Sequence, residues 1–315
     1  MKKLVIQIPC FDEETTLPIT LSVLPRQVPG VDVVEWLVVD DGSTDRTVEV
    51  ARENGVDQIV SFPKNQGLAK AFMAGLQAAL QAGADIIVNI DADNQYCADD
   101  IPKLIAPILA GKAEIVIGSR PIDQIEHFSR IKKFLQKLGS WVVRRVSQTE
   151  IPDASSGFRA FSRNAALALN VFSDYTYTLE TIIQAGQKGM AIISVPIRTN
   201  QDLRKSRLVK SVPSYVAKSM GTIFRIFVVY KPFDFFVFLG VVLFSLGTFV
   251  GLRFLYFYFT EGGPGHVQSL ILASILIGIG FQTIMVAFVA DLLSVNRKLL
   301  EELQYKSREN SRKDA

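Results

Sequence analysis

Two long apolar segments near the C-terminus constrain the fold of this chain more than any other feature. Residues 235–252 carry no charged side chain, the apolar run resumes over 254–259 after Arg253, and residues 267–290 are also uncharged. Each segment is long enough to cross the roughly 30 Å hydrocarbon core of a bilayer as a helix. A helix pair buried in a soluble core is the alternative. We expect transmembrane helices over residues 233–259 and 267–290.

The cations that flank these segments predict their orientation. Those before the first segment are Lys210, Lys218, Arg225 and Lys231, and those after the second are Arg297, Lys298, Lys306 and Arg308. The connection at 260–266 has neither Lys nor Arg, so the positive-inside rule places both flanks in the cytoplasm. The apolar run at 4–8, which ends at Pro9, is too short for a signal peptide. We expect a multi-pass protein of a bacterial-type inner (plasma) membrane, with the N-terminal domain and both termini cytoplasmic.

The chain around the two spans divides into further parts. Residues 208–230 mix cations with apolar side chains at three- and four-residue spacing, which is typical of helices that lie in the headgroup plane of a bilayer. An ordinary amphipathic core helix is the alternative. Residues 291–315 are charged and predict a helix that frays into a cytoplasmic tail. The expected parts are a globular domain (1–207), an interfacial segment (208–232), two spans (233–259 and 267–290) and a tail (291–315).

The composition narrows the class of protein. A chain of 315 residues can hold one α/β domain of ordinary size and a membrane part. Its net charge of +3 is too small to indicate nucleic-acid binding. Cys10 and Cys97 are the two cysteines, so the sequence indicates no disulfide framework and is compatible with a reducing cytoplasm.

The N-terminal domain alternates short β-branched runs with helical patterns. The runs at 4–8, 36–39, 59–61, 86–90, 115–117 and 192–197 predict strands, and the patterns at 44–54, 68–82 and 99–109 predict helices. This alternation is typical of a Rossmann-like, mostly parallel sheet with helices on both faces. In such an α/β fold the ligand site lies beyond the carboxyl ends of the strands.

Polar clusters follow four of the predicted strands, at residues 9–13, 40–43, 91–95 and 118–120. The most informative is Asp91-Ala92-Asp93, with Gln95 close behind, at the end of the run 86–90. Two carboxylates at a strand end can hold a hard divalent cation through oxygen and leave coordination positions for a diphosphate. The alternative is a solvated turn. His127 and His266 are isolated and lack metal-ligand spacing.

The order of these motifs resembles a known family. The chain has IPCFDEE at 8–14, VVDDGSTD at 38–45, NQG at 65–67 and DADNQ at 91–95, which together resemble family 2 glycosyltransferases with a GT-A fold. GSR at 118–120, DASSGFR at 153–159 and the paired spans resemble the polyprenyl-phosphate branch, which includes dolichol-phosphate mannose synthases and bactoprenol glucosyltransferases. Family members often have Tyr-Asn where this chain has Phe11-Asp12, and Gly-x-Ser-Lys where it has RKSR at 204–207.

The resemblance implies roles for individual residues. Mg²⁺ or Mn²⁺ would be held on the diphosphate by Asp91, Asp93 and Gln95. The nucleotide sugar would be bound by Pro9, Phe11, Glu13, Asp41, Asp91 and Ala92. Reaction and acceptor residues would be Asp93, Arg120, Asp153, Ser156 and Arg159, with Arg204 and Arg207 as further cations for the acceptor phosphate. Helix capping is the alternative for Asp41, a surface cation for Arg120, and a structural Ser-Gly turn for the segment 153–159.

The implied reaction is the inverting transfer of a hexose from a nucleotide sugar to a polyprenyl phosphate such as undecaprenyl phosphate. UDP-glucose is the favoured donor, and a GDP-mannose-dependent mannosyltransferase is the alternative. A processive polysaccharide synthase is disfavoured because Trp36 and Trp141 lack the Gln-x-x-Arg-Trp context. A nicotinamide-dependent enzyme is disfavoured because the first strand leads into Pro9-Cys10-Phe11 instead of a glycine-rich loop. A role as a non-catalytic membrane scaffold or lipid-translocating partner stays open as an alternative function. Assembly into a homo-oligomer also stays open.

Overall fold

The computed structural model describes residues 1–121, 140–141, 143–144, 147–171, 177–200, 221, 224–225, 228–262 and 266–310. The chain divides into two compact units. The first unit contains Met1–Ile223 and Gln304–Ala315, and the second unit contains Phe224–Leu303.

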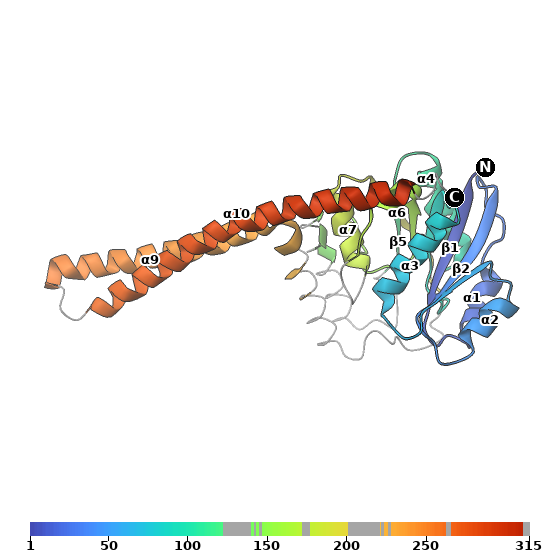
Figure 1. The fold of residues 1–315 in the computed structure, drawn as a ribbon, viewed down its shortest axis with the longest axis horizontal. Coiled ribbons are helices and arrows are strands. Elements are labelled where there is room, and N and C mark those ends of the chain that lie inside the picture. The colour runs from blue at the N-terminus through green and yellow to red at the C-terminus, as the bar shows by residue number, and fades with distance from the viewer. Residues whose placement is uncertain are drawn as a thin grey trace. The chain divides into compact units, whose positions relative to one another are not determined.

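One sheet organises the first unit. Within the described ranges it has seven strands in the order β3-β2-β1-β4-β6-β5-β7. The strands are β1 (Lys3–Cys10), β2 (Val33–Asp40), β3 (Gln58–Ser61), β4 (Ile86–Asn89), β5 (Ile115–Ser119), β6 (Arg159–Ser162) and β7 (Ile192–Pro196). β1 lies beside β2 in Figure 1 and pairs with it in parallel, as it also does with β4. β6 is antiparallel to β4 and β5. The predicted mostly parallel sheet is confirmed.

Helices cover both faces of this sheet. They are α1 (Leu17–Val23), α2 (Thr47–Glu53), α3 (Leu68–Gln81), α4 (Ile101–Leu109), α6 (Arg163–Ala168) and α7 (Thr178–Gln187), with a 3₁₀ turn at Ala98–Asp100. α1, α2 and α4 share a buried apolar cluster with Leu4, Ile6 and Ile8 of β1. On the other face, Phe72 of α3 packs against Phe161 and stacks on Tyr177.

The burial of β1 explains why its sequence has no polar alternation. Leu4, Val5, Ile6 and Ile8 are each 0% exposed, as expected for a parallel strand covered on both faces. β6, α1, α6 and α7 have no counterpart among the predicted elements. The start of α2 is three residues later than predicted because residues 40–46 form a turn, in which the Ser43 N–H donates to Asp40 Oδ1 at 3.0 Å.

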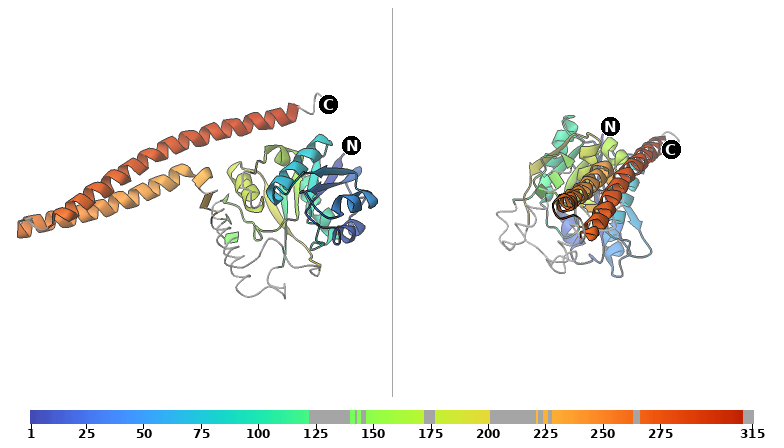
Figure 2. Two further views of the ribbon diagram at one scale, coloured as in Figure 1. Left: turned by 60° about the horizontal axis from the view of Figure 1, so that its bottom comes forward. Right: turned by 90° about the vertical axis from the view of Figure 1, so that its left-hand side faces the viewer.

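The second unit contains one long helix and most of another. α9 spans Pro232–Glu261, and α10 spans Val267–Asn310, so α10 continues well past the predicted end of the span at residue 290. Both are long and apolar enough to cross a membrane. They run side by side in Figures 1 and 2, and glycine allows their close approach: a Cβ on Gly247 would lie 2.8 Å from the Ile277 nitrogen.

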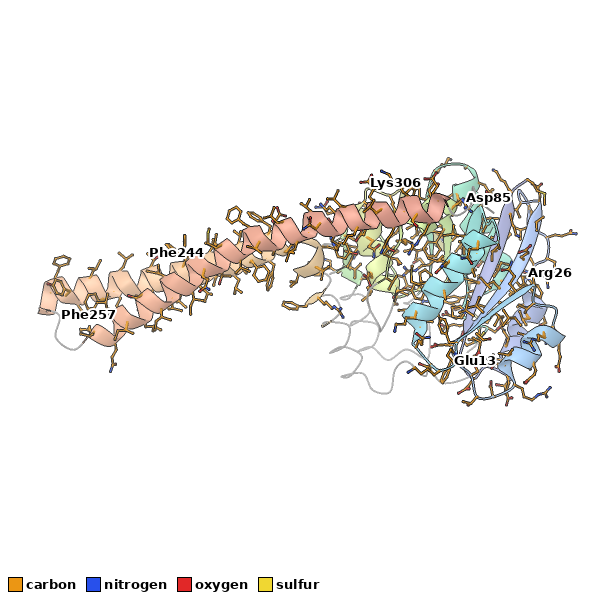
Figure 3. All side chains as sticks on the ribbon, in the orientation of Figure 1. Glu13, Arg26, Asp85, Phe244, Phe257 and Lys306 are labelled. Atoms are coloured by element: carbon orange, nitrogen blue, oxygen red, sulfur yellow. The ribbon has the colours of Figure 1, made fainter. Side chains whose placement is uncertain are left out.

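Large apolar side chains project outward from this helix pair. Phe238 is 70% exposed and Phe249 is 68% exposed, and Figure 3 shows the side chains that surround α9 and α10, with Phe244 and Phe257 labelled. An exposed apolar surface of this kind marks a region that contacts a membrane or another protein. Most of the expected interfacial segment, at 208–220, 222–223 and 226–227, lies outside the described residues.

Gly42 provides a test of the turn that follows β2. Its φ is +73°, and a Cβ there would lie 2.4 Å from the Lys64 carbonyl carbon. Gly42→Ala should therefore destabilise the first unit by more than the roughly 1–2 kcal/mol of left-handed strain alone. Urea unfolding of the full chain in detergent, followed by Trp36 fluorescence in a Trp141→Phe background, measures this loss. Gly83→Ala is the matched control, since Gly83 has a φ of +83° with nothing within 4 Å of its added Cβ. Equal losses for both variants would contradict the close packing of Gly42.

Candidate active site

The carboxyl ends of β1, β2 and β4 form one edge of the sheet. Cys10 lies opposite Asp40, and Gln7 lies opposite Asn89, so the loops that follow these three strands leave the sheet together. Figure 3 labels Glu13 at this edge. The polar clusters predicted at 9–13, 40–43 and 91–95 are therefore neighbours in space, as α/β ligand sites require.

Backbone and side-chain hydrogen bonds join the first two loops. The Asp12 N–H donates to Ser43 Oγ at 2.9 Å, and the Thr44 N–H donates to Asp12 Oδ1 at 2.8 Å. The Glu13 N–H donates to Thr47 Oγ1 at 2.8 Å. Pro9 lies within β1, whereas the Phe11 ring is 37% exposed and can meet a planar ligand.

Asp41 organises the segment that leads into α3. It is 4% exposed; its Oδ1 accepts from the Gln66 N–H at 2.7 Å, and its Oδ2 accepts from the Gly67 N–H at 2.9 Å. These bonds fix the two residues that precede α3, which begins at Leu68. The assignment of Asp41 to a nucleotide base stays a prediction.

The triplet after β4 lies in a tightly folded loop. Asp91, Asp93 and Gln95 are half-buried, and Ala92 is 3% exposed with its carbonyl accepting from Thr20 Oγ1 at 2.8 Å. Asn94 has a φ of +56°, and the Gln95 N–H donates to Asp93 Oδ1 at 3.2 Å. This geometry holds the 91–95 backbone in one conformation.

The donor set of this loop fits a hard divalent cation. Asp91 and Asp93 offer carboxylate oxygens and Gln95 an amide oxygen, which are the ligands that Mg²⁺ prefers. Among the described residues no group of three or more His, Cys, Asp or Glu could hold a metal by itself. An ion at this loop would complete its coordination with waters or with oxygens from a bound ligand.

A buried ion pair lies beside the triplet. Arg120 Nε donates to Asp153 Oδ2 at 2.7 Å and Nη2 donates to Oδ1 at 3.0 Å; the two side chains are 7% and 0% exposed. Burial alone would raise the pKa of Asp153, but the Arg120 charge and its hydrogen bonds lower that pKa. Burial alone would lower the pKa of Arg120, but Tyr96, Asp153 and Asp91 raise it. Both partners are thus charged at neutral pH.

Arg159 holds the backbone of the segment 154–156. It is 0% exposed; its Nε donates to the Ser156 carbonyl at 2.7 Å, and its Nη2 donates to the Ala154 carbonyl at 2.9 Å. Its Nη1 donates to the Thr178 carbonyl at 2.8 Å. Burial lowers the pKa of Arg159 to about 10, so the side chain is still a cation at neutral pH. These contacts favour a role in shaping the loop, and direct catalytic roles for Arg159 and the buried Ser156 stay predictions.

Several neighbours of the triplet are absent from the sequence prediction. Four buried side chains, each no more than 2% exposed, form hydrogen bonds with one another or with the Gly157 backbone. They are Gln7, Asn89, Tyr96 and Tyr177. Burial raises the pKa of Tyr96 to about 12, so its hydroxyl stays protonated. The sequence does contain a signal for two of these residues, because Gln7 and Asn89 each interrupt an otherwise apolar strand. Arg204 and Arg207 lie outside the described residues.

Comparison with known proteins identifies the family. The model of glycosyl transferase family 2 matches residues 5–169. The chain belongs to this family. It is therefore a glycosyltransferase, as the motifs predict.

Curated relatives and solved structures agree with this membership. The chain is 28% identical over 212 residues to undecaprenyl-phosphate mannosyltransferase of Micrococcus luteus, covering 64% of this chain and 85% of the relative. It is 31% identical over 223 residues to UDP-N-acetylglucosamine–dolichyl-phosphate N-acetylglucosaminyltransferase of Methanococcus voltae, covering 63% and 86%. Glucosyl-3-phosphoglycerate synthase of Mycobacterium tuberculosis has a similar fold, with a TM-score of 0.58 at 21% identity over 72% of this chain and 80% of that chain. The predicted GT-A fold is confirmed.

Asp153→Asn tests the buried ion pair. The variant leaves Arg120 as a buried charge without its counter-ion, which should cost about 3–5 kcal/mol at neutral pH. Because the folded-state pKa of Asp153 is lowered, the pair contributes its full stability above the ordinary aspartate pKa of about 3.9 and loses it as the pH falls through the folded value. The difference between wild type and variant should stay constant from pH 8 to about pH 5 and shrink only in stronger acid.

Urea unfolding followed by Trp36 fluorescence measures this difference at each pH. Glu53→Gln is the matched control, because it removes an ion pair with Arg46 whose side chains are 66% and 62% exposed. The control should leave the midpoint nearly unchanged. An Asp153→Asn variant as stable as this control would contradict the importance of the buried pair.

Proposed function

We propose that this glycosyltransferase moves a hexose from a nucleotide sugar to the phosphate of a polyprenyl phosphate, and that UDP-glucose is its donor. GDP-mannose is the second candidate donor, favoured by the mannosyl transfer named for the Micrococcus luteus relative and by the polyprenol monophosphomannose synthase of Mycolicibacterium smegmatis, 26% identical over 219 residues. Three of the relatives carry polyprenol, undecaprenyl phosphate or dolichyl phosphate in their names. That shared acceptor class supports a lipid phosphate here.

The observation that carries the proposal is the position of the Asp91–Gln95 loop in a chain that also has two apolar helices. The loop supplies two carboxylates at the carboxyl edge of the sheet, beside the buried Arg120–Asp153 pair. A nucleoside diphosphate is the ligand that a carboxylate-held cation would bind. Helices long enough to cross a membrane are compatible with a lipid-linked acceptor.

We propose that Asp91, Asp93 and Gln95 hold Mg²⁺ or Mn²⁺. The fold neighbour from Mycobacterium tuberculosis was solved with Mn²⁺ and UDP-glucose, which supports a divalent ion and a UDP-sugar in this fold. When bound, such an ion would neutralise the charge that develops on the departing diphosphate. The exposed ring of Phe11 would stack on the base, and Pro9, Glu13 and Ala92 would line the donor side of the site.

The acceptor supplies its own nucleophile. A phosphate monoester has a second pKa of about 6, so it is largely dianionic at neutral pH and needs no strong general base. One phosphate oxygen forms a bond to the anomeric carbon while the bond from that carbon to the nucleoside diphosphate breaks, and its electron pair leaves with the diphosphate. Attack from the opposite face inverts the configuration and gives a β-linked product from an α-linked donor. The residues of this chain bind and orient the two phosphates, with Arg204 and Arg207 as proposed cations for the acceptor.

The proposed activity can be measured with a panel of labelled nucleotide sugars and undecaprenyl phosphate. The wild type should form a labelled lipid phosphosugar with UDP-glucose or GDP-mannose, and chelation should abolish transfer. Asp93→Asn keeps the side-chain shape but removes a charged ligand, so turnover should fall at least 10²- to 10³-fold. Asp99→Asn is the control, because Asp99 is 79% exposed and lies in the same region. Full activity in chelator, or near-normal turnover of Asp93→Asn, would contradict the metal-dependent mechanism.

We also propose that both termini lie in the cytoplasm, because cations flank the helices and the connection at 260–266 has none. In a background with Cys10 and Cys97 replaced, a cysteine at position 263 should react with an impermeant thiol reagent added to intact cells. A cysteine at position 307 should react only after the membrane is permeabilised. The reverse labelling pattern would overturn this orientation.

A further inference from the structure

Two buried amide side chains interrupt the apolar core of the sheet. Gln7 of β1 and Asn89 of β4 are each 0% exposed and lie opposite one another across the strand pair. Gln7 Nε2 donates to Asn89 Oδ1 at 2.8 Å, which fixes the direction of the Asn89 amide. Gln7 Oε1 is buried and has no hydrogen-bond partner within the described part of the chain. Burial of such an atom costs free energy, so core stability alone gives no reason for an amide at this position.

The amide of Asn89 points toward the loop that precedes β6. Asn89 Nδ2 donates to the Gly157 carbonyl at 2.9 Å and to the Tyr177 hydroxyl at 2.8 Å. The Tyr177 hydroxyl donates in turn to the Gly157 carbonyl at 3.2 Å. The Tyr177 ring stacks on Phe72 with centroids 3.8 Å apart, so its hydroxyl has little freedom. Asn89 of β4 and Tyr177, the residue before α7, thus donate to the same backbone carbonyl, and Gln7 of β1 supports Asn89.

Gly157 is in turn packed against Asp91. A Cβ on Gly157 would lie 2.8 Å from Asp91 Oδ2, 3.0 Å from Asp91 Oδ1 and 3.1 Å from the Tyr177 hydroxyl. The Gly157 N–H donates to the Tyr96 hydroxyl at 3.0 Å. The Asp91 carboxylate therefore rests on a glycine whose N–H and carbonyl are both held by buried side chains.

We propose that Gln7, Asn89 and Tyr177 are positioning residues that set the direction of the Asp91 carboxylate through Gly157. All three are 0% exposed, so the role that we assign to them is indirect. The inference rests on the proposed function, in which Asp91 is a ligand of the divalent ion. It predicts that weakening this network, defined as Gln7, Asn89, Tyr177 and Gly157, lowers the affinity of the triplet for the ion even though every ligand of the triplet is present.

Tyr177→Phe is the most conservative change, since it keeps the stacked ring and removes the hydroxyl. Residues that orient metal ligands typically contribute 10- to 100-fold to metal affinity or activity. We therefore expect the dissociation constant of Mn²⁺, measured by electron paramagnetic resonance on the full chain with UDP or GDP present, to rise at least tenfold. Transfer assays should show a lower kcat, a higher Mn²⁺ requirement and a KM for the acceptor within about twofold of wild type.

Two further variants keep the inference testable if Tyr177→Phe does not fold. Asn89→Asp keeps the side-chain shape but removes both donors to Gly157 and Tyr177, and Gln7→Leu removes the bond that orients Asn89. Both should raise the Mn²⁺ dissociation constant. Ser147→Ala is the control, because it removes a buried hydroxyl that donates to the Val143 carbonyl at 2.7 Å outside the network. It should lower thermal stability without changing Mn²⁺ affinity.

The outcomes separate this inference from the proposed function. Wild-type affinity for Mn²⁺ in all folded network variants, with only their stability reduced, would overturn the positioning role and leave the proposed function intact. A wild type that binds no Mn²⁺ with either nucleotide would overturn the metal-dependent function together with this inference. Weakened Mn²⁺ binding in the network variants but not in Ser147→Ala supports the positioning role.

Discussion

The parallel pairing of β1 with β2 and β4 is the constraint on which the rest of the first unit depends. Parallel strands that are buried on both faces leave their carboxyl ends at one edge, and the loops that follow them carry the polar residues. Asp12 accepts from the Thr44 N–H, Asp41 accepts from the Gln66 N–H, and Thr20 donates to the Ala92 carbonyl. These hydrogen bonds hold the loops to one another and to the segments next to them. The site is therefore formed by residues far apart in sequence that a rigid sheet holds close together.

Charge balance is the second requirement at this edge. Asp91 and Asp153 supply two negative charges in a partly dry region, and Arg120 and Arg159 supply two positive charges. Arg120 pairs directly with Asp153, whereas Arg159 donates to backbone carbonyls of the same loop. The two arginines thus offset the negative charge that these acids bring to the site.

The sequence predicts the strands of the parallel core because continuous β-branched runs occur where both faces are covered. It does not predict β6, a strand of four residues that begins with the buried cation Arg159. The helix predicted for the charged tail is found, and it is continuous with the second span, since α10 extends from Val267 to Asn310. In the candidate site the motifs lead to Asp91, Arg120 and Asp153, but they do not reveal Tyr177, whose contact with Gly157 depends on the packing of α7. Gln7 and Asn89 do carry a sequence signal, because each places a polar side chain in an apolar strand.

The most direct measurement of the central claim is anomalous diffraction at the manganese edge from crystals of the full chain grown with Mn²⁺ and UDP or GDP. We expect one strong peak within coordination distance of the Asp91 and Asp93 carboxylates, bridged to the diphosphate and absent from Asp93→Asn crystals. A nucleotide bound at the sheet edge with no manganese at the triplet, or manganese bound elsewhere, would contradict the claim that this loop is the metal-dependent centre of sugar transfer.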